Sequence, residues 1–175
     1  MRVVASYAPI ESERLRLQEL AERDAAFILE LVNDPDWLRH IGDRGVRTLD
    51  DARAYIANGP ATMYARYGFG LWRVGRRDDD IAIGLCGLLK RDTLDDPDIG
   101  FAFLPAHRGR GYAFEAAQAT LACARERVGL KRVVAIVSPR NDASIALLER
   151  LGLRYETTFA SAADKPDTSL YACAL

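Results

Sequence analysis

The segment that runs through Gly109 and Gly111 most constrains how this chain can fold. Ile99–Leu104 is a short apolar run before these glycines, and Gly111–Arg127 is an alanine-rich helical stretch that ends at Gly129. Glycine lets a chain turn sharply and lets a ligand approach the backbone. The pattern therefore predicts a strand that passes through a tight glycine loop into the N-terminus of a helix.

This loop has the properties of an anion-binding site. A helix N-terminus presents unpaired N–H groups and the positive end of the helix dipole, and Arg108 and Arg110 add charge. These features predict a pyrophosphate site. A P-loop would need Gly-Lys followed by Ser or Thr, which is missing. A dinucleotide-binding fingerprint would need a third glycine where Phe114 stands, and an acid at the end of Val133–Val137. A helix start that binds no ligand is the remaining structural alternative.

Composition limits the class of protein. The 175 residues are 49% hydrophobic and 28% charged, which suits one domain with a substantial core. We expect a single domain over residues 1–175, with its core between about residues 11 and 175. The net charge of −1 gives no reason to expect direct nucleic-acid binding. No run approaches the roughly 20 apolar residues that span a bilayer, so no membrane partner is expected.

The cysteines predict neither a metal site nor a disulfide framework. Cys86, Cys123 and Cys173 are far apart and odd in number, and His40 and His107 are the only histidines. Cys86 lies in an apolar run and is expected in the core. The first ten residues have no long apolar region of the kind found in secretion signals. We therefore expect a cytoplasmic protein in a reducing compartment, without a bound metal.

Hydrophobic periodicity predicts an α+β fold. We expect strands at Glu13–Gln18, Gly68–Val74, Ile81–Leu89, Ile99–Leu104, Val133–Val137, Leu153–Phe159 and Thr168–Ala174, and helices at Arg23–Asn33, Thr48–Ile56, Gly111–Arg127 and Asn141–Leu151. The first two helices are expected to stop at Pro35 and at Gly59-Pro60. Three closely connected central strands predict an antiparallel meander, and the strand–helix–strand unit after them predicts a parallel pair. Together they form a mixed, mostly antiparallel sheet flanked by helices.

Two motifs resemble one known family. Arg108–Ala113 matches Arg/Gln-x-x-Gly-x-Gly/Ala, the acetyl-CoA pyrophosphate motif of the GNAT acyltransferases, and Asn141–Ser144 leads a helix that closes at Leu151–Leu153 as in that family. The resemblance covers roughly Glu11–Leu175. The opening Arg14-Leu-Arg-Leu is similar to the RimJ/RimL branch, which includes enzymes that acetylate the N-termini of ribosomal proteins.

The resemblance implies an N-acetyltransferase that uses acetyl-CoA as co-substrate and has a splayed sheet. It implies that strand backbone pairs with pantetheine, that loop amides bind the pyrophosphate, and that the second helix start contacts the pantetheine arm near the sulfur. The cofactor-binding residues so assigned are Phe101, Phe103, Arg108, Gly109, Arg110, Gly111, Tyr112, Ala113, Asn141 and Ser144. Asn141 and Ser144 also suit a helix start that binds no cofactor.

The catalytic residues implied by the resemblance are Ser144 and Asp98. Many GNAT enzymes have a tyrosine seven residues after the asparagine that corresponds to Asn141, and this tyrosine is the proposed acid that protonates the leaving thiolate. This chain has Leu148 at that position, and Tyr155 does not replace it by alignment. Ser144 therefore takes the role of the acid that protonates the leaving thiolate, as proposed in the RimL branch. Asp98 is the nearest carboxylate for a base, although a solvated acidic turn explains it equally well. His107 is expected to pack beside the loop.

The acceptor groove is expected along Asp34–Arg44. Trp37 and His40 are the candidate substrate-binding residues, although Trp37 could equally well fill the core between the helices. Because the chain lacks an obvious strong base, it fits an α-amine acceptor at a protein N-terminus better than a lysine side chain. The alternatives are a small-molecule acetyltransferase acting on a polyamine, amino acid or antibiotic, and a non-catalytic acyl-CoA-binding module. The oligomeric state, a homodimer included, stays open.

Overall fold

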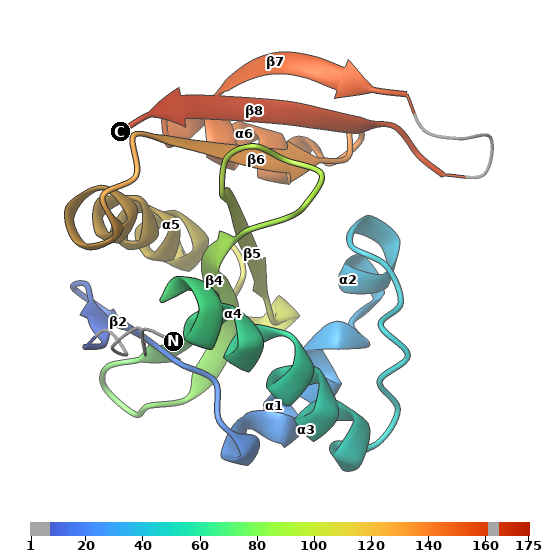
Figure 1. Ribbon diagram of the computed structural model, residues 1–175. Coiled ribbons are helices and arrows are strands. Elements are labelled where there is room, and N and C mark those ends of the chain that lie inside the picture. The colour runs from blue at the N-terminus through green and yellow to red at the C-terminus, as the bar shows by residue number, and fades with distance from the viewer. Residues whose placement is uncertain (1–7, 161–164) are drawn as a thin grey trace.

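One mixed sheet organises the chain in a computed structural model that describes residues 8–160 and 165–175. Within these residues eight strands lie in the order β1-β2-β3-β4-β5-β6-β8-β7 (Figure 1). The strands are β1 Ile10–Glu11, β2 Leu15–Gln18, β3 Leu71–Arg76, β4 Ala82–Leu89, β5 Asp98–Phe103, β6 Arg132–Val137, β7 Arg154–Phe159 and β8 Thr168–Ala174. Neighbouring strands are antiparallel except for β5 and β6. The predicted mixed, mostly antiparallel sheet is confirmed.

The sheet opens between its two parallel strands. β5 pairs with β4 at six positions, but it pairs with β6 at only one, where Asp98 faces Val134. Val134 N also donates to Pro97 O at 3.1 Å. Beyond this point the strands separate, so the edge of β5 that faces β6 has no strand partner among the described residues. The predicted splay is therefore present.

Helices cover both faces of the sheet. They are α1 Ala25–Val32, α2 Pro35–His40, α3 Leu49–Asn58, α4 Pro60–Tyr67, α5 Tyr112–Cys123 and α6 Asp142–Arg150, with short turns η1 Glu22–Asp24, η2 Pro105–His107 and η3 Ala124–Val128. Adjacent strand residues point to opposite faces. Accordingly Cys86 packs in the larger core cluster with α5, and Leu85 packs in the second cluster with α1 and α3. The predicted core position of Cys86 is confirmed.

Two helices lie where the sequence reasoning expected loops. The predicted ends before Pro35 and Pro60 are confirmed, since α1 ends at Val32 and α3 at Asn58, but each proline also begins a further helix, α2 and α4. Proline is favoured at this position because its fixed φ suits the first turn and its missing N–H has no intrahelical acceptor there. Trp37 consequently lies on a helix and is buried. The short strand β1 was also missed.

The predicted helix ends agree more closely with the structure. Thr48 caps α3, and its hydroxyl accepts a hydrogen bond from Asp51 N at 3.1 Å. Asn141 caps α6, and Gly152 follows that helix with φ +95°. The helix predicted to begin at Gly111 begins one residue later and continues through the π-helical turn η3 to Gly129.

No helix among residues 8–160 and 165–175 has the length and apolar character needed to cross a membrane. Within the same residues no cluster of three or more His, Cys, Asp or Glu side chains suits a metal ion. The expectation about the first ten residues concerns a segment of which residues 1–7 lie outside the described part of the chain.

Candidate active site

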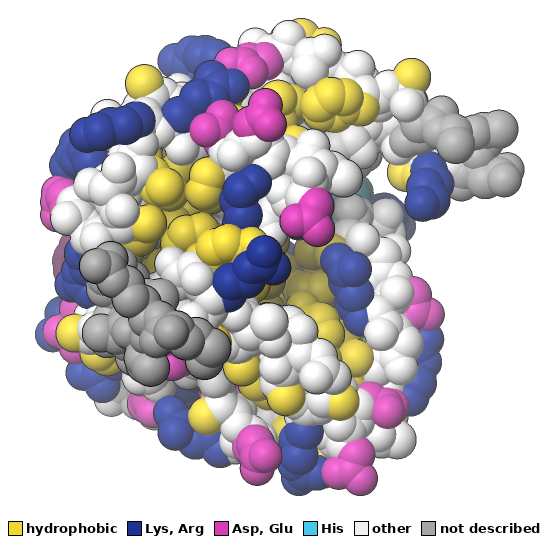
Figure 2. Space-filling model, in the orientation of Figure 1, with side chains coloured by type: hydrophobic (Ala, Val, Ile, Leu, Met, Phe, Trp, Pro, Cys, Tyr) yellow, Lys and Arg dark blue, Asp and Glu magenta, His cyan; other side chains and the backbone are white. Residues whose placement is uncertain are grey.

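A cavity of about 700 Å³ lies where the sheet opens. It is lined by α2, by β5, by the loop before α5, by the end of β6 and by α6. Figure 2 shows a hollow near the centre of one face of the molecule, with hydrophobic side chains at its floor and Lys or Arg side chains at its edges. Of the predicted site residues, the cavity brings together Trp37, His40, Asp98, Phe101, Phe103, Arg108, Gly109, Gly111, Tyr112, Ala113, Asn141 and Ser144, and leaves out Arg110.

The glycine loop turns through left-handed backbone at two positions. Gly109 has φ +72° and Gly111 has φ +79°, a region that favours glycine. A Cβ at Gly109 would meet nothing within 4 Å, so the space in front of the loop is open. No side chain caps α5, and Glu115 N donates to Gly111 O in the first backbone bond of the helix. The amides before Glu115 are therefore suited to hold an anion.

Arg14, in the turn between β1 and β2, holds this loop in place. Its Nε donates to Glu115 Oε2 at 2.7 Å, its Nη1 donates to Arg110 O at 2.9 Å, and its guanidinium lies 4.5 Å from the centre of the Tyr112 ring. Burial raises the pKa of Glu115, but hydrogen bonds from Ser12 and Arg14 outweigh it and leave the pKa below its ordinary value. Glu115 is thus an ionised anchor for the loop.

The Arg108 side chain points to α2. Its Nη2 donates to Asp34 Oδ2 at 2.7 Å, its Nη1 donates to Asp36 Oδ2 at 2.5 Å, and its Nε donates to Phe103 O at 3.0 Å. The charge predicted to assist the pyrophosphate is thus paired with two carboxylates. The Arg108 amide donates to Pro105 O at 3.2 Å. Arg108 therefore links the end of β5 to the N-terminal end of α2.

The predicted pantetheine strand has one open edge. Phe101 is half-buried on the cavity wall, while Phe103 is buried in the larger core cluster. Because β6 diverges after Asp98, the backbone of this edge is free to pair with an extended ligand. The geometry suits the pairing that the sequence resemblance implies, which stays a prediction.

Asn141 and Ser144 meet at the start of α6. Asn141 Oδ1 accepts a hydrogen bond from Ser144 N at 3.2 Å, so the cap role expected of Asn141 is present. Ser144 is half-buried on the cavity wall. Leu148, at the position of the missing tyrosine, is buried in the core. Tyr155 is 57% exposed and is not part of the cavity lining. Ser144 is therefore the hydroxyl that α6 presents to the cavity.

Asp98 lies where β5 and β6 part. It is buried and accepts a hydrogen bond from Arg91 Nε at 3.0 Å. Burial raises the pKa of Asp98, and the nearby Arg91 only partly opposes this effect. A buried carboxylate with a raised pKa is well suited to accept a proton. Because Asp98 is buried, it is not part of a solvated acidic turn, which was the alternative that the sequence left open.

The acceptor side of the cavity combines predicted and unpredicted residues. Trp37 is buried and also lines the cavity, with Nε1 donating to Gly42 O at 3.1 Å, so it is both wall and core residue. His40 is half-buried beside it. His107 is half-buried on the cavity wall, and its Nδ1 has no hydrogen-bond partner among the described residues. Arg44, at the end of the predicted acceptor segment, lines the cavity, and so does Tyr55, which carries no sequence motif that could have identified it.

Comparison with known proteins identifies the family. Residues 14–154 match the model of the acetyltransferase (GNAT) domain. The chain belongs to the GNAT acetyltransferase family. It is 29% identical to the uncharacterized N-acetyltransferase YnaD of Bacillus subtilis over 150 residues, which cover 86% of this chain and 85% of that protein. Its relatives are named N-acetyltransferases, and we conclude that this GNAT protein is an acyltransferase enzyme.

Solved structures share the fold. The structure superposes on a GNAT acetyltransferase from Bacillus anthracis with a TM-score of 0.80 and 26% identity, over 95% of this chain and 98% of that one. It also resembles RimL, a ribosomal L7/L12 alpha-N-protein acetyltransferase solved in complex with coenzyme A, with a TM-score of 0.72 and 18% identity, over 96% and 98% of the chains. The second likeness concerns the fold alone. GNAT acetyltransferases use acetyl-CoA, which fits the open glycine loop.

Proposed function

We propose that this GNAT enzyme transfers the acetyl group of acetyl-CoA to the α-amine at a protein or peptide N-terminus, as a member of the RimJ/RimL branch. The observation that carries the proposal is one continuous cavity that joins the glycine loop, the open edge of β5 and Asp98 to the α2 wall. The fold likeness to RimL supports the choice of acceptor. The free thiols of Cys86, Cys123 and Cys173 support a cytoplasmic location.

Acetyl-CoA would enter with its pyrophosphate at the start of α5. Backbone amides from Gly109 to Ala113 would bind the phosphate oxygens, because the helix N-terminus carries partial positive charge. Pantetheine would pair with β5 and lead the thioester toward Asp98 and Ser144. A backbone N–H of the open strand would polarise the thioester carbonyl, a kind of contact worth roughly 3 kcal/mol of barrier in other enzymes.

The chemistry is direct transfer in a ternary complex. The neutral amine attacks the thioester carbonyl carbon and forms a tetrahedral intermediate, Asp98 accepts the amine proton, and the C–S bond breaks. Ser144 passes a proton to the CoA thiolate and takes one back from solvent, while Asp98 releases the amine proton to solvent, so that CoA leaves as the thiol. Binding both substrates in one cavity makes the attack effectively intramolecular, and this proximity supplies much of the acceleration.

The difference in basicity between an α-amine and a lysine side chain supports an α-amine acceptor. At about pH 7.4 an α-amine with a pKa of about 8 is roughly one-fifth neutral, while a lysine side chain with a pKa of about 10.4 is only about 0.1% neutral. Asp98 is paired with Arg91 and is the carboxylate placed to act as base, so the site is better suited to the more readily deprotonated α-amine.

The test is to locate the acetyl group on a peptide that carries both a free N-terminus and an internal lysine. The protein is incubated with acetyl-CoA at about pH 7.4, and tandem mass spectrometry maps the product. We expect acetylation at the α-amine. Faster acetylation of the lysine, or of a polyamine, an amino acid or an aminoglycoside offered in parallel, would contradict the proposal and favour the small-molecule alternative. No turnover with any amine would favour an acyl-CoA-binding module.

A further inference from the structure

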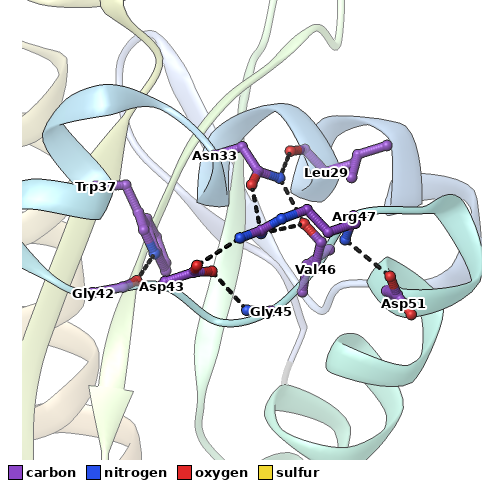
Figure 3. Close-up of polar contacts among 9 residues, drawn as sticks. All are labelled: Leu29, Asn33, Trp37, Gly42, Asp43, Gly45, Val46, Arg47 and Asp51. Carbon is purple, nitrogen blue, oxygen red and sulfur yellow. Dashed lines mark hydrogen bonds and ion pairs between the residues drawn. The ribbon is translucent and has the colours of Figure 1, made fainter.

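The segment between α2 and α3 is held in place by a polar network (Figure 3). Arg47 donates to Asp43 Oδ2 at 2.5 Å and to Asn33 Oδ1 at 3.0 Å. Asn33 Nδ2 donates in turn to Leu29 O at 2.8 Å and to Val46 O at 2.9 Å. At the start of the segment Trp37 Nε1 donates to Gly42 O, and at its end Arg47 N donates to Asp51 Oδ2. Within it, Gly45 N donates to Asp43 Oδ1. A loop tied to helices on both sides can present a side chain in a defined position.

Arg44 is the charged residue of this segment that the network does not use. Its guanidinium makes no hydrogen bond or ion pair with any other described residue, and it lines the cavity. Tyr55 is another lining residue. Burial raises the pKa of its hydroxyl, and the charge of Arg44 acts in the opposite direction, which indicates that the two side chains are close. The arginine is thus available to a ligand.

The carboxylates of the cavity wall are already paired. Among the described lining residues these are Asp34 and Asp36, which accept from Arg108, and Asp98, which accepts from Arg91. None of these described carboxylates is therefore left to neutralise Arg44. Its charge faces the space that an acceptor would occupy.

Arg44 belongs to the acceptor end of the cavity. The N-terminal end of α2 contacts Arg108, and Arg44 follows the other end of this helix. Six helical residues span about 9 Å, which separates the Arg44 segment from the Arg108 contact. Arg150 also lines the cavity and has no ion pair among the described residues, but its guanidinium lies over the Phe114 ring at 4.4 Å, close to the start of α5.

We propose that Arg44 makes this enzyme select peptide N-termini that carry a carboxylate side chain in the first residues after the reacting amine. This inference rests on the proposed N-terminal acceptor. Arginine binds carboxylates through two parallel hydrogen bonds, and a cationic wall also attracts an acidic peptide before it binds. The selectivity belongs to the binding step, because Arg44 has no part in proton transfer or thiol release.

The experiment compares two peptides that differ only in charge, beginning Ser-Asp-Asp and Ser-Asn-Asn. The wild-type enzyme should show a kcat/KM about 10-fold higher for the acidic peptide, the size of effect expected for one charged contact. Arg44→Gln should remove this preference through KM of the acidic peptide, and should leave the amide peptide and acetyl-CoA binding unchanged. Arg44→Glu should shift the preference to Ser-Lys-Lys.

The matched control is Arg53→Gln, because Arg53 is exposed on α3, pairs with Asp50 and does not line the cavity. It should keep the wild-type preference. Equal rates with both peptides in wild type and Arg44→Gln would overturn the inference and leave the proposed function intact. If wild type binds acetyl-CoA but acetylates none of the peptides, the N-terminal acceptor fails, and the inference with it.

Discussion

The two ends of the cavity are built in different ways. At the end proposed to bind phosphate, the glycine loop and the start of α5 present backbone, and Arg14 and Glu115 only hold the loop in place. At the end proposed to bind the acceptor, α2 and the segment after it present side chains, which ion pairs and hydrogen bonds hold in place. Backbone geometry suits a ligand part that every family member shares, while side chains can differ from one enzyme to the next. Changes at the first end should therefore affect acetyl-CoA binding, and changes at the second should affect the acceptor.

The largest effect is expected at Gly111. Gly111→Ala places a Cβ 3.3 Å from Arg14 Nη2 at φ +79°, and should weaken acetyl-CoA binding about 100-fold because it distorts the amides proposed to bind the pyrophosphate. Isothermal titration calorimetry measures this. Gly129→Ala is the control, since it has the same φ of +79° but follows the distant end of the same helical stretch. If both variants lose affinity equally, general strain rather than loop geometry is responsible.

Asp98 should give the next largest effect, at the point where the two ends meet. Asp98→Asn should lower kcat about 30-fold, less than the roughly 10²–10⁴-fold typical of a positioned general base, because an α-amine is already partly neutral near pH 7.4. Because folding raises the pKa of Asp98, the wild-type kcat should fall with decreasing pH at a pKa above the ordinary value of 3.8, and the variant should lack this step.

The thermal stability of the Asp98→Asn variant is the control for its effect on kcat. A raised folded-state pKa means that the neutral form favours folding and that ionisation above this pKa opposes it. The neutral Asn should therefore not lower the melting temperature at neutral pH. A kcat profile with the same acid step in both proteins would remove Asp98 from the proton transfer.

The smallest effect tests the link between the two ends. Asp34 is buried and joins Arg108 to the N-terminus of α2, so Asp34→Asn should raise KM for the acceptor about 10-fold as α2 shifts, with a smaller change for acetyl-CoA. Asp36→Asn removes the exposed carboxylate of the same cluster and should change either KM less than about 2-fold. Equal effects of the two variants would show that the buried pair does not position α2.

The contrast also explains what the sequence could predict. The glycines, the strand before them and the cap at Asn141 follow from local rules, because φ above zero and helix capping restrict residue type. Side-chain partners do not follow local rules. The Arg108 guanidinium contacts residues more than 70 positions away, and α2 and α4 begin at prolines that the same rules also allow as helix ends.

The acceptor wall was predictable only in part. Trp37 and His40 lie on the cavity as expected, and Arg44 lies at the end of the segment predicted to form the acceptor groove, although the sequence did not single it out. Arg91 and Tyr55 were missed because nothing in their sequence neighbours marks them. They become recognisable only once the sheet opens beside α2. The roles of Ser144 and Asp98 in catalysis stay predictions, which their positions on the cavity wall support.

The most direct test of the central claim is calorimetric titration of the wild-type protein with acetyl-CoA, S-acetylpantetheine and NAD, after a thermal melt has shown that it is folded. We predict micromolar binding of acetyl-CoA and binding of S-acetylpantetheine at least about 100-fold weaker because it lacks the pyrophosphate. NAD, which has a pyrophosphate but no pantetheine arm to pair with the open edge of β5, should not bind. Equal affinity for acetyl-CoA and S-acetylpantetheine, or no binding of acetyl-CoA, would contradict the account of the glycine loop.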